Sequence, residues 1–126
     1  MGARTVEELI CYQLALQLRK VCMAITARPA FKDDRRFRDD FRAAARSASS
    51  NIAEGFRRRT HREFARYLEY SMSSIAETAH HVNDARSCGY ISVGEEANCL
   101  QLAKRSNTAV SRLRRYLLDN PDAPHE

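Results

Sequence analysis

Residues 35–63 read RRFRDDFRAAARSASSNIAEGFRRRTHRE. The apolar side chains before Gly55 recur every three or four residues, which is the spacing of one helix face and not the alternation of a strand. The inward face predicted for a helix from Arg35 to Glu54 consists of Phe37, Phe41, Ala44, Ala45, Ala48 and Ile52. Gly55 follows as a predicted left-handed C-terminal cap. Thr60 and Glu63 then form a capping box, in which the hydroxyl and the carboxylate satisfy free backbone N–H groups at a helix start.

The same signals recur on both sides of this stretch. Two further capping boxes, Thr5 to Glu8 and Ser92 to Glu95, each open a run with helical spacing. We therefore expect helices from about Val6 to Ala27, from Thr60 to a cap at Gly89, and from Ser92 to Asn120. The inward positions predicted for them are Val6, Leu9, Ile10, Leu14, Leu18, Val21 and Ile25; Phe64, Leu68, Ser71, Ile75, Ala79 and Val82; and Val93, Ala97, Leu100, Val110, Leu113 and Leu117.

The connections between these helices are short, so consecutive helices should lie antiparallel. The predicted fold is all-α, an up-down-up-down antiparallel four-helix bundle. We expect residues 1–120 to form one domain and residues 121–126 to be a frayed tail. A chain of 126 residues with only four Gly and three Pro fits such a domain of long helices.

Several observations bear on the compartment. No stretch approaches the ~18 consecutive apolar residues of a membrane span, and no signal peptide precedes the first helix. The four cysteines, Cys11, Cys22, Cys88 and Cys99, have neither CxxC spacing nor the pattern of a small disulfide-stapled domain. The sequence thus predicts reduced thiols in a cytoplasmic protein with no membrane partner.

Four apolar residues fall off the predicted inward faces: Leu16, Met23, Leu102 and Leu118. Ordinary scatter explains a single exposed apolar residue, because much of any protein surface is apolar. Several on the first and last helices would instead form a second apolar face suited to self-association. The sequence leaves both readings open.

Basic residues are concentrated in two segments. The chain carries 21 Lys/Arg and 16 Asp/Glu, a net charge of +5, and residues 28–62 alone account for +6. The predicted nucleic-acid-binding residues are Arg57, Arg58, Arg59, Arg62 and Arg66 in the first segment and Lys104 and Arg105 in the second. Phe56, His61, Tyr67 and Tyr70 lie nearby and could stack on bases. The alternative is a solvated basic face partly paired with Glu63 and Glu69.

Catalytic and metal-binding patterns are incomplete. Glu77 and His80 have the Glu-x-x-His spacing of di-iron bundles, but the second such pair and half the remaining ligands are missing. Ser47, Ser49 and Ser50 lie within a predicted helix with no base placed to activate them. We expect no catalytic residue, no metal site and no cofactor.

Asn51 and Glu54 flank the inward-facing Ile52 and need partners. A polar group near a bundle core costs ~1–3 kcal/mol if it is unsatisfied. Glu54 also sits at a helix C-terminus, where the helix dipole disfavours an anion. We predict a hydrogen-bonded clasp that fixes this turn, with a backbone donor or a nearby arginine as the partner of Glu54.

The stretch from Ala45 to Gly55 resembles the signature of the 23S rRNA-intervening-sequence protein family, roughly Arg-(Ala/Ser)-x-x-Ser-x-x-Asn-Ile-x-Glu-Gly. The usual continuation is matched by Arg57 to Arg59, by Glu63-Phe64 and by Ser74 to Glu77. The residues that match the signature, and that we expect to be structural, are Ser47, Asn51, Glu54, Gly55, Glu63, Phe64 and Glu77. One departure is Ser50, where the family has an aliphatic residue, which should soften one core position.

This resemblance implies a bundle that assembles into a ring, commonly a homopentamer, with no enzymatic activity. It also implies kinship with accessory proteins of diversity-generating retroelements, which bind nucleic acid and a reverse transcriptase through a basic barrel. Two functions follow as expectations. The first is a ring-forming, nucleic-acid-binding or ribonucleoprotein accessory factor, and the second is a protein–protein scaffold with incidental positive charge.

Overall fold

The computed structural model describes residues 2–124, and most of them are helical. Four long α-helices follow one another: α1 (Ile10–Thr26), α2 (Arg35–Phe56), α3 (His61–Ser87) and α4 (Val93–Leu118). Two short 3-10 helices, η1 (Val6–Glu8) and η2 (Pro29–Phe31), precede α1 and α2. The predicted all-α four-helix fold is confirmed.

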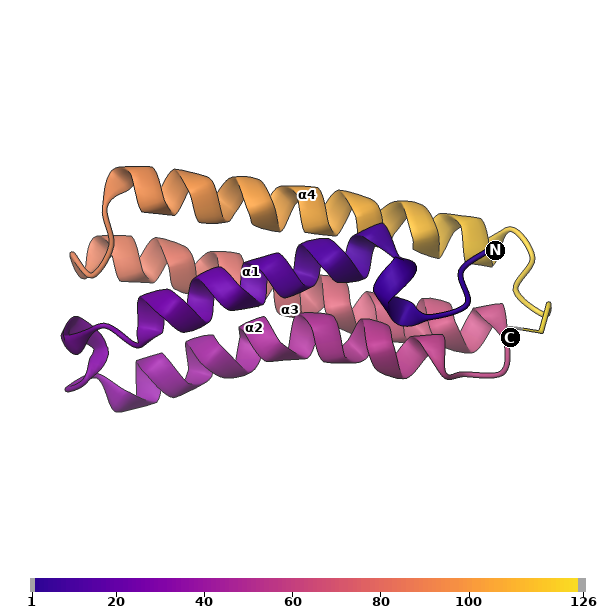
Figure 1. The fold of residues 1–126 in the computed structure, drawn as a ribbon, viewed down its shortest axis with the longest axis horizontal. Coiled ribbons are helices and arrows are strands. Elements are labelled where there is room, and N and C mark those ends of the chain that lie inside the picture. Colours follow the sequence, from indigo (N-terminus) through magenta and orange to yellow (C-terminus); the bar gives the residue numbers. More distant parts are fainter. Residues whose placement is uncertain (1, 125–126) are drawn as a thin grey trace.

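The four helices enclose one core. Contacts join α1 to α2, α2 to α3, α3 to α4 and α4 back to α1, so each helix packs against two neighbours. Figure 1 shows the helices side by side along the long axis, with each one returning in the direction opposite to the one before it. The α2–α3 turn, the start of the chain and the end of α4 therefore lie at one end of the bundle, and the α1–α2 and α3–α4 connections lie at the other.

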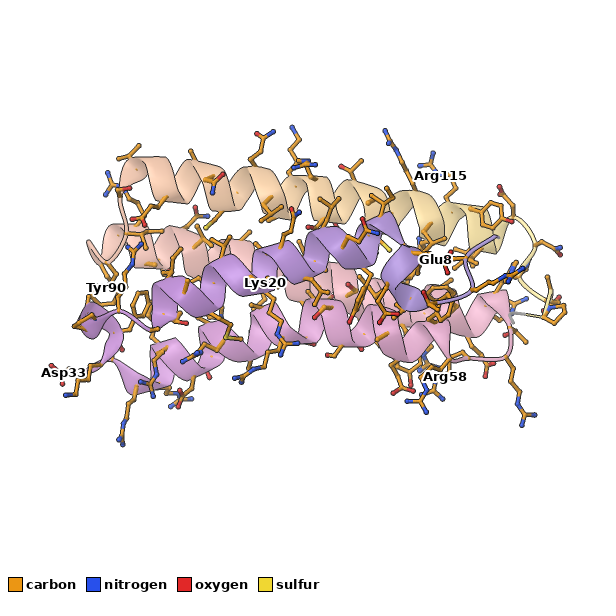
Figure 2. The ribbon with its side chains drawn as sticks, in the orientation of Figure 1. Glu8, Lys20, Asp33, Arg58, Tyr90 and Arg115 are labelled. Carbon is orange, nitrogen blue, oxygen red and sulfur yellow. The ribbon has the colours of Figure 1, made fainter. Side chains whose placement is uncertain are left out.

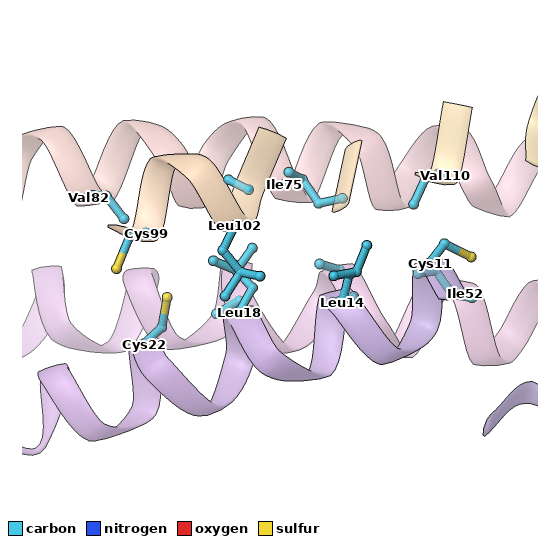
Figure 3. Packing of buried hydrophobic residues seen from close by; sticks show 14 of the residues in the cluster. Cys11, Leu14, Leu18, Cys22, Ile52, Ile75, Val82, Cys99, Leu102 and Val110 are labelled. Atoms are coloured by element: carbon cyan, nitrogen blue, oxygen red, sulfur yellow. The ribbon is translucent and has the colours of Figure 1, made fainter. Parts of the chain in front are cut away.

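Aliphatic and small side chains fill the space between the helices. Figure 3 shows Leu14 and Leu18 of α1 reaching toward Leu102 and Val110 of α4 and toward Ile75 of α3. Burial of this kind stabilises a fold by ~25 cal/mol for each Å² of apolar surface removed from water. The predicted inward face of α2 holds, since Phe41, Ala44, Ala45, Ala48 and Ile52 are all buried and Phe37 is packed against them.

Free cysteines contribute to this core. Cys11, Cys22 and Cys99 are buried and Cys88 is exposed, and all four are unpaired thiols, as predicted. Figure 3 shows the side chains of Cys22 and Cys99 pointing toward one another between α1 and α4. Burial raises the pKa of Cys22 to about 12 and that of Cys11 to about 11, so both remain protonated.

The first helix begins later than predicted. The Thr5 box caps η1 and not α1, and the backbone at Leu9 is extended, with φ −77° and ψ 126°. Because of this break, the side chain of Leu9 lies in the core and is 8% exposed, whereas Ile10 is 65% exposed. The prediction that Ile10 faces inward was wrong. Periodicity alone missed the break because η1 continues the helical spacing.

The predicted inward face of α4 holds for Leu100, Val110, Leu113 and Leu117 but is wrong at the start of the helix. Val93 and Ala97 are exposed, whereas Cys99, Leu102 and Ala103 are buried. Ser106 lies in the same buried stripe and donates a hydrogen bond to the carbonyl of Leu102 (2.8 Å), which satisfies its hydroxyl. Because a buried position of α4 carries a polar residue, the apolar pattern did not show which face of the helix is buried. Leu102 belongs to the core and is not part of a second apolar face.

The two predicted glycine caps differ. At Gly89, φ is +77°, and the N–H groups of Gly89 and Tyr90 donate to the carbonyls of Arg86 (3.0 Å) and Ala85 (2.9 Å), a complete Schellman motif. Gly55 instead lies inside α2 with an ordinary helical backbone, so its predicted role as a left-handed cap was wrong.

Residues 121–124 are held against the start of α3, so the expectation of a frayed tail does not hold for them. The N–H groups of His61 and Arg62 donate to the carbonyls of Ala123 (3.1 Å) and Pro121 (2.8 Å). Asp122 forms an ion pair with Arg62 at 3.1 Å. Residues 125 and 126, the rest of the predicted tail, lie outside the described residues. No helix within residues 2–124 has the length and hydropathy needed to cross a membrane.

Candidate nucleic-acid interface

The predicted basic residues of the first segment gather where α2 turns into α3. Arg57 caps the C-terminus of α2, and three residues later Thr60 accepts a hydrogen bond from the backbone N–H of Glu63 (3.2 Å) at the start of α3. This short turn forces the two helix ends together. Figure 2 labels Arg58 toward this end of the bundle and Tyr90 at the opposite end.

The close approach depends on Gly55. A Cβ atom at this position would lie 2.7 Å from Cδ1 of Phe64 and 2.8 Å from Cβ of Tyr67, distances that real Cβ atoms essentially never show. Phe64 itself is fully buried. Glycine is therefore required here by the close approach of two helices, and not by a left-handed backbone.

Arg58 belongs to the predicted clasp. Its guanidinium donates to the carboxylate of Glu54 (2.6 Å) and to the hydroxyl of Tyr67 (2.8 Å), and its Cζ lies 4.5 Å from the centroid of the Tyr67 ring. The prediction of an arginine partner for Glu54 is confirmed. Because these contacts engage its charged head, Arg58 is the member of the cluster least available to an external anion.

The other four arginines of the cluster are exposed. Arg57 and Arg59 form no ion pair with any residue that the structure describes. Arg62 is paired with Asp122, and Arg66 donates from Nε to the hydroxyl of Tyr70 (2.9 Å), a contact that raises the pKa of Arg66. Exposed pairs of this kind contribute little stability, so solvent or a phosphate can compete for both side chains.

Lys104 and Arg105 are not part of this cluster. They lie more than three turns before the end of α4, and they face different neighbours although they are adjacent in sequence. Lys104 lines a groove between α3 and α4 with Ala76, whereas Arg105 lines one between α1 and α4 with Gln17. The predicted second basic patch is thus divided between two faces.

One basic residue near the cluster was not predicted. Arg114 of α4 lines a groove of about 320 Å³ with Arg62 and Arg66, and it donates to Glu69 of α3 at 2.7 Å. The local sequence does not show that Arg114 lies beside Arg62 and Arg66, because this depends on how α4 packs on α3. The only signal is that Arg114 and Leu118 have the four-residue spacing of one helix face. Of the aromatic residues proposed for stacking, Tyr70 is 42% exposed, while Tyr67 and Phe56 are half-buried and His61 is buried.

A sequence profile of the 23S rRNA-intervening sequence protein family matches residues 7–112, which span α1 to α3 and most of α4. The chain belongs to this family. A search among curated proteins found no match. The family match covers Arg57 to Arg66 and Lys104 and Arg105, and it ends before Arg114.

The signature residues of the family lie mainly where α2 meets α3. Asn51 donates from Nδ2 to the carbonyl and to the hydroxyl oxygen of Ser47 (both 2.9 Å), and the hydroxyl of Ser74 on α3 donates to Ser47 (2.8 Å). This network satisfies Asn51, as its position beside Ile52 required. Ser50, the departure from the signature, is exposed, so the expected softening of a core position was wrong.

The remaining signature residue, Glu77, was considered as a metal ligand with His80. The structure instead places Glu77 3.4 Å from Nε2 of His81, and His80 3.4 Å from Asp84. Within residues 2–124, no three His, Cys, Asp or Glu side chains gather in a way that could hold a metal ion. The hydroxyls of Ser49 and Ser50 donate to carbonyls one turn earlier in α2, those of Arg46 and Ser47.

Proposed function

We propose that this protein is a non-enzymatic, ring-forming accessory factor that binds nucleic acid through the basic α2–α3 end of each subunit. The observation that carries the proposal is the composition and exposure of that end. Residues 57–66 contain five arginines and one glutamate, and Arg57 and Arg59 project from it without an ion pair to any described residue. Arginines of this kind hold phosphates with little sequence preference and with affinity that falls steeply with salt.

The ring-forming part of the proposal is supported by an apolar groove between the start of α1 and α4, on the side of α4 that faces away from α3. Leu9, Ile10, Ala109 and Leu113 line it, its volume is about 420 Å³, and Ile10 is 65% exposed. A second copy that covered this groove would remove apolar surface from water. Repetition around a closed ring would bring several basic ends together, so weak sites would act with a high effective concentration.

The pentamer implied by the family resemblance is the ring size that we favour. In this role the protein would serve a ribonucleoprotein or a retroelement, where a reverse transcriptase is one candidate protein partner. The function needs no catalytic residue, metal or cofactor. Binding alone would be its contribution.

The test is a pair of double charge reversals that change net charge equally. Arg57→Glu/Arg59→Glu alters the basic end, and Arg35→Glu/Arg36→Glu alters exposed arginines at the start of α2, near the other end of the bundle. Fluorescence anisotropy with a labelled structured RNA and a labelled single-stranded DNA would report affinity. We expect a loss of at least tenfold for the first variant and a loss below threefold for the second. Equal losses would show that only net charge matters and would refute the assignment of the site.

Light scattering coupled to size exclusion tests the ring. We expect a mass five times the chain mass of 14.4 kDa, and Ile10→Glu should reduce it because a carboxylate would enter the apolar groove. A wild-type mass equal to that of one chain would contradict the ring.

A protein–protein scaffold is the second candidate, and the same apolar groove favours it. Under this hypothesis the positive charge has no role in binding. It predicts stable oligomers that are not retained on heparin at moderate salt, with a protein partner recovered by pull-down. Retention on heparin that is lost in Arg57→Glu/Arg59→Glu would favour the nucleic-acid reading instead.

A further inference from the structure

Basic side chains continue beyond the α2–α3 end along one face of the bundle. Arg62 and Arg66 stand one turn apart on α3, and Arg114 of α4 shares their groove. Further along the same pair of helices, Lys104 lines a second groove with Ala76 and Ala79 of α3. Ten residues separate Lys104 from Arg114, which corresponds to about 15 Å of helix.

The opposite side of α4 carries its own basic residues but faces α1. Arg105 lines a groove with Gln17 and Lys20, and Arg112 lines the apolar groove with Ile10. Each basic residue of α4 on the α3 side thus has a basic neighbour in sequence on the α1 side: Lys104 beside Arg105, and Arg114 two residues from Arg112. If α1 and α4 form the ring contact, the α3 side remains open to solvent.

Carboxylates on the α3 side reduce its positive charge but do not cancel it. Glu63 and Glu69 line the groove, and Glu69 holds Arg114 at 2.7 Å. The side chains of this pair are 33% and 54% exposed, so it is a surface ion pair that a phosphate can displace at little cost. Asp122 on Arg62 is more exposed still, at 85%.

An exposed aromatic ring stands beside these cations. Tyr70 is 42% exposed, its hydroxyl accepts from Arg66, and its ring meets Tyr67 edge to face at a centroid distance of 5.5 Å. Those contacts fix the ring from one side. Exposed aromatic rings beside a line of cations are typical of single-strand binding, because unpaired bases stack on the ring while the cations hold the backbone.

We propose that a single strand of nucleic acid lies along the α3–α4 face, with its phosphates on Arg62, Arg66, Arg114 and Lys104 and a base stacked on Tyr70. This path rests on the nucleic-acid function proposed above and adds to it a face and a preference for single strands. Base-paired duplexes would bind less tightly, because their bases are already stacked on one another.

The matched neighbours on α4 provide the test. Lys104→Glu and Arg105→Glu have the same effect on net charge, as do Arg114→Glu and Arg112→Glu. With a labelled 20-nucleotide poly(U) probe, we expect Lys104→Glu and Arg114→Glu each to weaken binding about 5- to 10-fold and to reduce the magnitude of the salt slope by about 0.7. At protein concentrations where light scattering gives each variant the wild-type oligomer mass, Arg105→Glu and Arg112→Glu should remain within about twofold of the wild-type affinity.

The outcomes separate the two proposals. Wild-type protein that binds poly(U), with equal losses in both members of each pair or larger losses on the α1 side, would overturn the α3–α4 path and leave the proposed function intact. Wild-type protein that binds neither poly(U) nor the structured RNA would overturn both, and binding to the structured RNA alone would overturn only the single-strand path. Circular dichroism and light scattering on each variant would establish that helix content and oligomer mass are unchanged.

The stacking step has a separate readout. Tyr70→Ala should weaken poly(U) binding about tenfold and leave the affinity for a duplex of equal length almost unchanged. Tyr70→Phe keeps the ring and removes the hydroxyl that accepts from Arg66, so it should retain most of the wild-type affinity. An equal loss for both probes in Tyr70→Ala, or an affinity for duplex above that for poly(U), would refute the single-strand assignment.

Discussion

The close contact of α2 with α3 at Gly55 can be tested by adding one methyl group. In Gly55→Ala, the new Cβ would sit 2.7 Å from the Phe64 ring and 2.8 Å from Cβ of Tyr67, against 3.4–4 Å for ordinary contact. The helices or the ring must therefore move by roughly 1 Å in a core where Phe64 is fully buried. Overpacking of this kind costs ~1–3 kcal/mol. Alanine regains up to ~1 kcal/mol through its helix propensity.

We therefore expect Gly55→Ala to lower the free energy of unfolding by ~1–2 kcal/mol, equivalent to a drop in Tm of a few degrees. Urea titration followed by circular dichroism would measure it, at equal protein concentrations because assembly affects apparent stability. Gly94→Ala is the matched control. Its Cβ would meet only Oγ of Ser92 at 3.9 Å, so its stability should be unchanged or slightly raised.

A second substitution separates steric crowding from backbone strain. A left-handed cap tolerates asparagine, whereas a tight helix contact rejects a larger side chain more strongly than alanine. We expect Gly55→Asn to be less stable than Gly55→Ala. Stability of Gly55→Ala equal to or above that of the wild type, or rescue by asparagine, would refute the packing argument.

Three further predictions concern charge, thiols and the tail. The side chain of Arg28 and the backbone N–H of Ser92 lower the pKa of Glu95 from 4.5 to about 2, so its ionised form stabilises the fold above pH 4.5 and that contribution disappears as the pH falls toward 2. Glu95→Gln should flatten this part of the stability profile in urea titrations from pH 7 to pH 2, and an unchanged profile would contradict the assignment. Iodoacetamide should label native Cys88 well before the other three cysteines, which are buried, and mass spectrometry after denaturation should show all four modified; rapid native labelling of more than one thiol would contradict the buried positions. Deletion of residues 121–126 should speed hydrogen exchange at the amides of His61 and Arg62, which donate to Ala123 and Pro121, and unchanged exchange would mean that the tail does not protect them.

Helix number and most core positions could be predicted from sequence because they depend on local periodicity and capping. Thr60, Ser92 and Gly89 mark helix ends by hydrogen bonds within a few residues. Ser92 and Gly89 act as predicted, whereas at Thr60 only the hydroxyl half of the predicted capping box forms. Gly55 was misread because its requirement comes from a residue on another helix, Phe64, which no local pattern reveals. The late start of α1 was missed for a related reason, since the 3-10 turn before Leu9 has helical spacing but a different axis.

In the candidate site, too, residues that are close in sequence could be predicted together, whereas residues brought together by helix packing could not. The cluster from Arg57 to Arg66 is contiguous in sequence and remains together in space. Arg114 joins it only through the packing of α4 on α3, and Lys104 and Arg105 separate because adjacent helical residues point about 100° apart. Which arginines are engaged internally, as Arg58 is by Glu54 and Tyr67, depends on distances that the sequence does not contain.

The affinity of the wild-type protein for single-stranded RNA across a salt series tests the central claim most directly. The account predicts binding at low salt, with the logarithm of the association constant falling linearly as the logarithm of salt concentration rises, at a slope of about −0.7 for each phosphate held. Three or four such contacts on one subunit would give a slope of roughly −2 to −3, and several subunits of a ring on one strand would make it steeper. Absence of binding at low salt, or an affinity that does not change with salt, would contradict the account and favour the scaffold.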